Sequence, residues 1–449
     1  MRGIGIIDGS ETDRVSARYG PQPTSPGQRP GSPRRRFLLA FLVLPLVASP
    51  WASASEELPR TNPEAVGFST ERLRRINDVV QRHIAEHHIA GAVTLVARRG
   101  RVVHFEAQGL MDLDSKRPMK TDTLFRMASS TKPVTGVAVM MMIEEGKVRL
   151  TDPLSKFIPE FKGTKVAVEE EGKSDLKLVA ADREITIRDL LTHTSGLASG
   201  GLGTRKLPRE ALFPRGEDTL ASLMTRLSSV PLDFQPGTRW RYSGLAGLDV
   251  LSRVVEVTSG QSYDQFLRQR IFEPLGMKDT FFVVPDDRQA RLATVYRGTA
   301  KGLEKSTFTL RFPKSYFSGA GGLVSCAADY FRFAQMLVNR GQLNGHRLLS
   351  PRAVELYSSN QVGDMFGGQL GRRKGMGFGL SVEVVVDAVQ AGLFRSNGSF
   401  GWDGAFGTHF WVDPKEQLVG VFLVQAQAGP VVQGIHRDFE TAVMQAIVE

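Results

Sequence analysis

Cysteine is almost absent from the sequence: Cys326 is the one cysteine among 449 residues. No intrachain disulfide is therefore possible, and cysteine use does not report the compartment of the protein. The chain also lacks the Gly-x-Ser-x-Gly motif, which exposes the nucleophile of α/β-hydrolases. Its apolar runs are too short for a membrane-spanning helix, which needs about 20 residues. These absences exclude a disulfide framework and give no support to an α/β-hydrolase or a stable membrane span.

Long basic runs are also missing outside the N-terminus, although the net charge is +10. Nucleic-acid binding usually involves basic clusters interleaved with aromatic side chains, so we expect no nucleic-acid partner. The excess positive charge is interpreted as a solubilising surface. With 41% hydrophobic residues, the chain can bury a large core.

Residues 1–54 are predicted to be a disordered extension followed by a signal peptide. Glycine, proline, serine and arginine dominate residues 1–33, and the basic Arg34–Arg36 precede an apolar run that ends at Val47. The small residues Ala52–Ala54 then form a cleavage site of the A-x-A type. The paired arginines also resemble a twin-arginine export signal. We expect a periplasmic or secreted protein; an uncleaved tail anchored at the membrane is the alternative.

The order of the predicted elements is a helix, a hairpin, a long helical middle, and then strands and a last helix. This order predicts one sheet domain built from both ends of the chain, residues 55–125 and 300–449, with a helical domain, 126–299, inserted. Helices are predicted after the cap Ser69, from Ile187 to a glycine stop at Gly196, and at 245–257, 264–271, 329–338 and 432–448. A hairpin is predicted at 92–106, an exposed polar excursion at 162–183, and strands within 290–320 and at 377–384, 401–412 and 418–424.

Ser129 and Lys132 stand three residues apart at the start of an apolar stretch that runs to Ile143. Residues i and i+3 share one face of a helix, so the hydroxyl and the amine can meet. The helix N-terminus also favours developing negative charge at the serine. These are the parts of an acyl-transfer nucleophile. A second copy of the spacing, Ser174 and Lys177, lies in a polar stretch and is interpreted as solvated surface.

A His-x-x-Glu-His sequence at His83–His87 matches a pattern found in zinc sites. No third ligand is evident, and the residues fall on or near the polar face of an amphipathic helix. We interpret them as solvated surface side chains. The sequence therefore gives no reason to expect a bound metal ion or an organic cofactor.

Five motifs occur together and in order along most of the chain. As a set they resemble the serine β-lactamase-related family, which includes class C β-lactamases, D-Ala-D-Ala carboxypeptidases and family VIII esterases. The resemblance implies an α/β (α+β) fold: an antiparallel sheet flanked by helices, plus an all-helical domain, with the nucleophile between them. The motifs are Ser129-x-x-Lys132, Leu190–Leu197, Pro236–Thr238 followed by Tyr242 and Ser243, Ser318–Gly322, and Gly401–Gly404.

The resemblance implies that Ser129 is the nucleophile and that Lys132 and Tyr242 share the proton transfer. Serine is a poor nucleophile at neutral pH and needs a base. The sequence leaves open which of the two neighbours takes the proton. The implied oxyanion hole consists of the backbone N–H groups of Ser129 and Ala405. The implied oxyanion and substrate-binding residues are Trp402, Gly404 and Ala405.

Two positions depart from the β-lactamase pattern. The second motif there is Tyr-x-Asn, whereas Tyr242–Gly244 offers no amide side chain to hold Lys132. The third motif there is Lys-Thr-Gly, but Trp402 replaces the lysine, as it does in family VIII esterases. That lysine would pair with a substrate carboxylate, a contact worth about 1.5–3 kcal/mol. The side chains that could restore the charge are His409, Arg239 and Arg241.

The favoured interpretation is a serine carboxylesterase that cleaves small esters through an acyl-enzyme on Ser129. The alternative is a β-lactamase, D-aminopeptidase or amidase that uses the same residues on an amide. A non-catalytic cell-wall or ligand-binding relative is a third interpretation, which the intact set of Ser129, Lys132 and Tyr242 disfavours. The expected partner is therefore a small ester or amide. The sequence determines neither the physiological substrate nor the oligomeric state.

Overall fold

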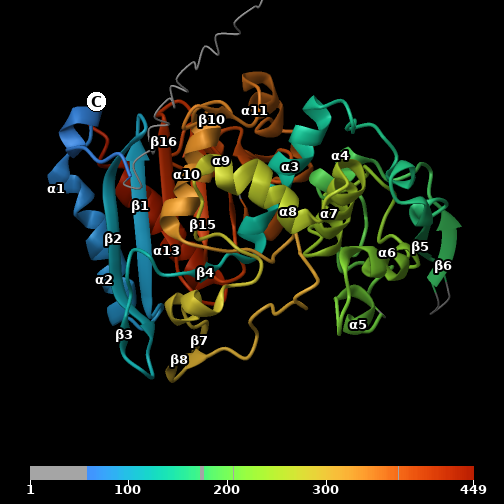
Figure 1. Ribbon diagram of the computed structural model, residues 1–449, viewed down its shortest axis with the longest axis horizontal. Coiled ribbons are helices and arrows are strands. Elements are labelled where there is room, and N and C mark those ends of the chain that lie inside the picture. The colour runs from blue at the N-terminus through green and yellow to red at the C-terminus, as the bar shows by residue number, and fades with distance from the viewer. Residues whose placement is uncertain (1–57, 172–175, 206, 373) are drawn as a thin grey trace, which may run out of the picture. The chain divides into compact units, whose positions relative to one another are not determined.

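An antiparallel sheet of eight strands organises the described part of the chain (Figure 1). The computed structural model describes residues 58–449 except 172–175, 206 and 373, so the predicted signal peptide and Ser174 lie outside the described residues. This architecture confirms the expected α/β (α+β) fold. In spatial order the strands are β12 (Met376–Phe378), β13 (Glu383–Val385), β14 (Phe400–Asp403), β15 (His409–Asp413), β16 (Leu418–Leu423), β1 (Gly91–Arg98), β2 (Arg101–Asp112) and β3 (Arg117–Pro118).

Strands from the two ends of the chain meet in the middle of this sheet. The predicted hairpin is confirmed: β1 and β2 pair across Arg99 and Gly100, both of which adopt positive φ angles. On its other side β1 pairs with β16, where Val93 lies opposite Leu423. Every residue of β1 is buried, because helices cover both faces of the sheet.

Each face of the sheet has its own helical cover. Helices α2 (Arg75–Ala85) and α13 (Pro430–Met444) pack together on one face, and α10 (Ala327–Val338) packs against β1, β15 and β16 on the other. The predicted cap is confirmed, since the Ser69 hydroxyl accepts a hydrogen bond from the Arg72 N–H and begins α1 (Thr70–Leu73). Side chains of alternating residues in the strands therefore enter two separate cores.

The segment between the two groups of strands is mostly helical, and α3 (Lys132–Glu144) is buried against α7 (Ala246–Ser259) and α11 (Pro351–Tyr357). The remaining helices are α4 (Ile187–Leu191), α5 (Arg209–Leu212), α6 (Leu220–Ser228), α8 (Tyr263–Leu267), α9 (Glu273–Leu275) and α12 (Ala388–Ala391). The shorter strands are β4 (Phe125–Arg126), β5 (Lys165–Glu169), β6 (Leu176–Ala180), β7 (Tyr296–Thr299), β8 (Gly302–Lys305), β9 (Val324–Ser325), β10 (Gln342–Leu343) and β11 (His346–Arg347).

Two predictions about this segment were wrong in part. The polar stretch 162–183 is not wholly exposed, because it forms the hairpin β5–β6 and buries Val166 and Ala167. The Ala167 N–H donates to the Leu232 carbonyl, which ties the hairpin to the core. Within 290–320 the only strands are those of the short hairpin β7–β8, and most of the remaining residues form turns and loops. The predicted domain boundaries at 125/126 and 299/300 stay a prediction.

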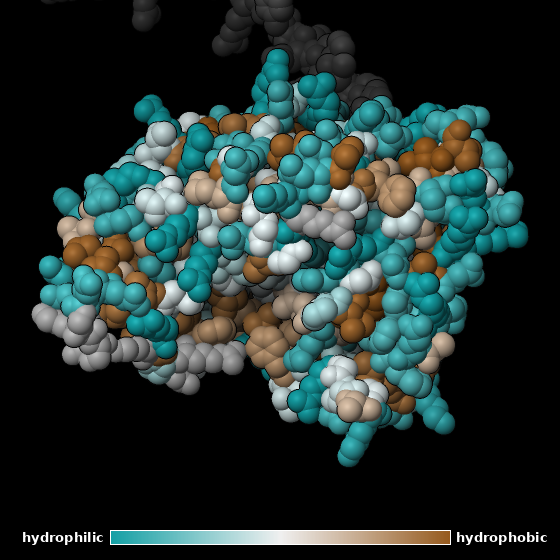
Figure 2. Space-filling view, turned by 180° about the vertical axis from the view of Figure 1, so that it is seen from behind, coloured by the Kyte–Doolittle hydropathy of each residue, from teal (hydrophilic) through white to brown (hydrophobic). Residues whose placement is uncertain are grey.

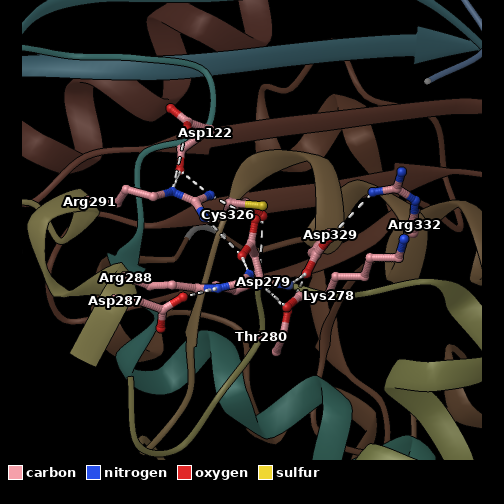
Figure 3. Close-up of polar contacts among 11 residues, drawn as sticks. Asp122, Lys278, Asp279, Thr280, Asp287, Arg288, Arg291, Cys326, Asp329 and Arg332 are labelled. Carbon is pink, nitrogen blue, oxygen red and sulfur yellow. Dashed lines mark hydrogen bonds and ion pairs between the residues drawn. The ribbon is translucent and has the colours of Figure 1, made fainter. Parts of the chain in front are cut away.

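A cluster of ion pairs joins the segment after α9 to the start of α10 (Figure 3). Arg288 and Arg291 both donate to Asp279, and the Asp279 N–H donates to Asp329 at 2.6 Å. Burial raises the pKa of Asp329 to about 6. The thiol of Cys326 lies in the same cluster, and burial raises its pKa too, which makes it a poor nucleophile.

No helix among the described residues has the length and apolar character needed to cross a membrane. Seen from behind (Figure 2), the surface is mostly hydrophilic, and hydrophobic side chains gather in a hollow near the middle of that face.

Candidate active site

Ser129 and Lys132 meet as the sequence predicts. A 3₁₀ turn (Ala128–Thr131) leads directly into α3, and the Lys132 Nζ donates a hydrogen bond to the Ser129 Oγ at 3.3 Å. Ser129 is half-buried, whereas Lys132 is fully buried. Ala128, just before the serine, has a φ of +45°. Backbone strain of this kind in a non-glycine residue is found mainly at functional sites.

Backbone carbonyls hold the amine of Lys132. Its Nζ donates to the Gly244 carbonyl at 2.6 Å and to the Ala320 carbonyl at 2.7 Å, besides Ser129. An ammonium has three donors, and all three are used here. Gly244 is the residue that stands where the β-lactamase motif has asparagine. The missing amide is therefore replaced by a backbone carbonyl, which the sequence could not reveal.

Asp249 positions the loop that carries Ala320. Its carboxylate accepts hydrogen bonds from the Tyr316 hydroxyl at 2.7 Å, the Ser318 hydroxyl at 2.7 Å and the Ala320 N–H at 3.0 Å. Burial raises the pKa of Asp249 to about 6. Asp249 was not predicted as a site residue, since the predicted helix 245–257 contains a second acidic side chain, Glu256, and nothing in the sequence distinguishes the two.

Tyr242 lies beside the pair, with its ring centre 5.0 Å from the Lys132 Nζ. Behind it packs His193 from the Leu190–Leu197 motif, at a ring distance of 4.7 Å. The Ser243 N–H donates to the Nδ1 of His193 at 3.3 Å. Burial and the nearby charge of Lys132 hold the pKa of His193 well below its usual range. The imidazole is therefore neutral and can accept this bond, so His193 is a positioning residue that the sequence analysis did not single out.

Aromatic rings continue from Tyr242 to the sheet. The ring of Trp402 on β14 lies 5.6 Å from that of Tyr242, and Phe378 meets Trp402 edge-on at 5.2 Å. Trp402 is only 3% exposed, yet its Nε1–H has no hydrogen-bond partner among the described residues. This wall is apolar, with one free donor.

The turn after β14 lies directly against the turn that carries the serine. A Cβ atom on Gly404 would lie 2.0 Å from the Thr408 Oγ1 and 2.4 Å from the Met127 carbonyl oxygen, so only glycine fits. Ala405 packs against the cluster that contains Ala128. In the described part of the chain, neither the Ser129 N–H nor the Ala405 N–H donates to a backbone carbonyl. Two free donors on adjoining turns suit an oxyanion hole.

Of the three side chains proposed to restore the missing cation, His409 is excluded by its position, whereas the role of Arg239 and Arg241 stays a prediction. His409 lies on the opposite face of the sheet, where it stacks on Trp411 and His436. Arg239 and Arg241 are exposed, and Arg241 donates to the Gly200 carbonyl. Arg372 comes within 6.0 Å of the Trp402 ring, but it donates to two carboxylates, those of Glu383 and Asp403.

A buried charge cluster fills the opposite face of the sheet, around a cavity of about 70 Å³. The His409 Nδ1 is hydrogen-bonded to the Asp403 carboxylate at 2.6 Å, and the His409 Nε2 lies 3.0 Å from the Glu440 carboxylate. Burial alone would lower the pKa of His409, but the two carboxylates outweigh it and raise the pKa to about 9. His409 therefore forms ion pairs with Asp403 and Glu440, whereas burial lowers the pKa of His436 to about 4 and leaves that imidazole neutral.

The helix-flanked sheet, the helical insertion and the serine–lysine pair define a serine hydrolase of the β-lactamase fold. The family model described as Beta-lactamase matches residues 76–443. The chain therefore belongs to this family, and the resemblance inferred from the five motifs is confirmed.

Individual relatives include proteins named as esterases. Protein Rv1367c of Mycobacterium tuberculosis is 37% identical over 75% of this chain and 86% of its own length. Esterase EstB of Burkholderia gladioli is 32% identical, over 78% of this chain and 90% of its own. The solved structure of EstCE1, "a hydrolase with promiscuous acyltransferase activity", matches with a TM-score of 0.71 and 29% identity, covering 83% of this chain and 99% of that one. The chain is a hydrolase with esterases among its relatives.

Proposed function

We propose that the protein is a carboxylesterase that cleaves small, uncharged esters through an acyl-enzyme on Ser129. Its Oγ attacks the ester carbonyl carbon, and the hydroxyl proton passes either to Lys132 in its neutral amine form or to Tyr242 in its phenolate form. The negative oxygen is stabilised by the N–H groups of Ser129 and Ala405. The alcohol leaves with a proton, and water then attacks the acyl carbon to release the acid and restore Ser129.

The observation that carries the ester preference is the aromatic wall beside Ser129. Trp402 stands where the β-lactamase motif has a substrate-binding lysine, and Arg372, which approaches the Trp402 ring, is paired with Glu383 and Asp403. A substrate carboxylate would lose its water there without gaining a fixed cation. A neutral ester has no such cost. The relatives named as esterases support the same substrate class.

A substrate panel on the purified protein tests the proposal. We expect p-nitrophenyl esters to turn over far faster than a chromogenic cephalosporin or a D-Ala-D-Ala peptide. Ser129→Ala should lower kcat on esters by at least about 10⁴-fold, because the acyl-enzyme cannot form. A fluorophosphonate should add its mass to Ser129 alone.

Ser174→Ala is the matched control, because it removes the serine of the second Ser-x-x-Lys copy. It should keep the full rate, and Ser129→Ala should keep the thermal midpoint of the wild type. Faster cleavage of the cephalosporin or the peptide than of any ester would overturn the ester assignment. Ester turnover of a few per cent in Ser129→Ala would overturn the nucleophile.

A further inference from the structure

The end of α2 gathers three side chains that the active site does not use. The helix ends at Ala85, and the chain then reverses so that His88 comes back over His83. The Nδ1 atoms of the two histidines lie 2.9 Å apart. The carboxylate of Glu86 lies 3.7 Å from the Nδ1 of His83 and 3.2 Å from that of His88. Three potential ligand atoms therefore face one point.

The spacing of these atoms fits a divalent transition metal. Zinc binds imidazole nitrogen and carboxylate oxygen at about 2.0–2.2 Å in a tetrahedral arrangement, which places neighbouring ligand atoms about 3.3 Å apart. The three separations in the structure, 2.9, 3.2 and 3.7 Å, bracket that value. Two imidazoles and one carboxylate are also a ligand set that zinc accepts.

The Nε2 of His83 contacts a carboxylate, as the second ring nitrogen of metal-binding histidines often does. Its Nε2 lies 3.1 Å from the carboxylate of Asp438 on α13, and Arg82 fixes that carboxylate at 2.5 Å. The Nε2 therefore carries the proton, and the lone pair of Nδ1 points at His88 and Glu86. A carboxylate behind the ligand histidine orients the ring and strengthens it as a ligand. His83 is only 7% exposed, so its orientation is fixed.

Hydrogen bonding places a single proton among these three atoms. With the lone pair of His83 facing inward, the one proton on the Nδ1 of His88 has two acceptors, His83 and Glu86. A cation in the centre would satisfy all three atoms at once. The interpretation of these residues as solvated surface was wrong for His83, which is buried and hydrogen-bonded to Asp438.

We propose that His83, Glu86 and His88 bind a zinc ion at the C-terminal end of α2, with water as the remaining ligand. Glu86 and His88 line a cavity of about 860 Å³ beside β7–β8 and the start of α13, which gives the ion access from solvent. By binding His83 and His88, the ion stabilises the chain reversal after α2, and Asp438 holds His83 from the other side. It lies on the face of the sheet opposite Trp402, so it takes no part in ester cleavage.

The structure predicts a ligand different from that of the linear motif. The sequence pattern pairs His83 with His87, but His87 is exposed with a φ of +56°. Calorimetric titration of untagged, chelator-treated protein with Zn²⁺ distinguishes the two. We expect one ion per chain, a loss of affinity of at least about 100-fold in His88→Ala, and no change in His87→Asn, a residue that tolerates positive φ. Asp438→Asn should weaken binding about 10-fold.

Thermal unfolding provides the second readout, independent of catalysis. Zn²⁺ should raise the midpoint of the wild type and of His87→Asn, since an ion that binds only the folded state stabilises it. It should leave the midpoint of His88→Ala unchanged. Because His88 is partly exposed, its replacement leaves the core intact even if His83→Gln fails to fold. Absence of stoichiometric zinc binding, or equal binding by His88→Ala, would overturn the proposal.

Discussion

Trp402 and Asp403 are consecutive residues of β14, yet they face two different environments. Trp402 packs against Tyr242 and Phe378 beside Ser129. Asp403 points to the other face, into a buried cluster in which every arginine and histidine charge meets a carboxylate. The alternation of a β-strand thus separates an apolar wall from a charged core. A family that binds anions at this strand can in this way lose its anion site while keeping its catalytic turn.

Among changes that test this comparison, Gly404→Ala should give the largest effect, because Gly404 lies at the junction of the two regions. A methyl group there would push against the Met127 carbonyl and separate the Ala405 N–H from Ser129. Loss of one oxyanion donor typically costs about 10²–10³ in kcat. Steady-state kinetics on a p-nitrophenyl ester measures the loss. Gly434→Ala on α13, where a Cβ meets nothing within 4 Å, is the control and should keep the rate. An unchanged kcat in Gly404→Ala would contradict the assigned oxyanion hole.

The buried charge cluster around His409 should make the free energy of unfolding fall as the pH rises from 6 to 10. The pKa of His409 is about 9 in the folded state and about 6.5 in an unfolded chain. Its contribution is therefore complete below pH 6.5 and is lost as the pH rises through about 9. The difference corresponds to about 3 kcal/mol in the free energy of unfolding. Urea titrations from pH 6 to 10 should show this decline. His409→Gln should flatten it; an equal slope in that variant would assign the decline elsewhere.

Trp402→Lys tests the apolar face of β14 directly and should give the smallest of the three effects. It places a cation on the apolar face where β-lactamases carry one. We expect KM for an ester that bears a carboxylate to fall about 10-fold, the value of a modest charge-assisted contact. Neutral esters should lose rate because the wall is gone. Trp402→Phe keeps the wall and should show no gain for the anionic ester. A gain in both variants would show that the missing cation does not set the substrate preference.

Much of this arrangement could be predicted from local sequence. The hairpin β1–β2 follows from apolar stretches around Arg99 and Gly100, and α3 follows from its unbroken apolar run. The meeting of Ser129 and Lys132 follows from helical spacing alone, and the structure bears it out at 3.3 Å. Patterns of this kind are local, so a single sequence carries them.

The groups that complete the site could not be predicted, because they are set by tertiary packing. The carbonyls of Gly244 and Ala320 belong to backbone that every residue has, so no side chain announces them. Asp249 acts through a loop about 70 residues away in sequence. His88 was missed because helical spacing points to His87, whereas the helix has already ended. In each case the long-range path of the chain decides which atoms meet.

The position of β1 between β2 and β16 also has a consequence for folding. Val93 has Ala107 on one side and Leu423 on the other, so half of its partners belong to a segment that is synthesised much later than β1. Until then the hairpin presents an unpaired and mostly apolar strand edge, which is a template for association with other chains. Contacts across such a separation also form slowly. Newly made chains of this protein should therefore depend on chaperones until residue 423 has been synthesised.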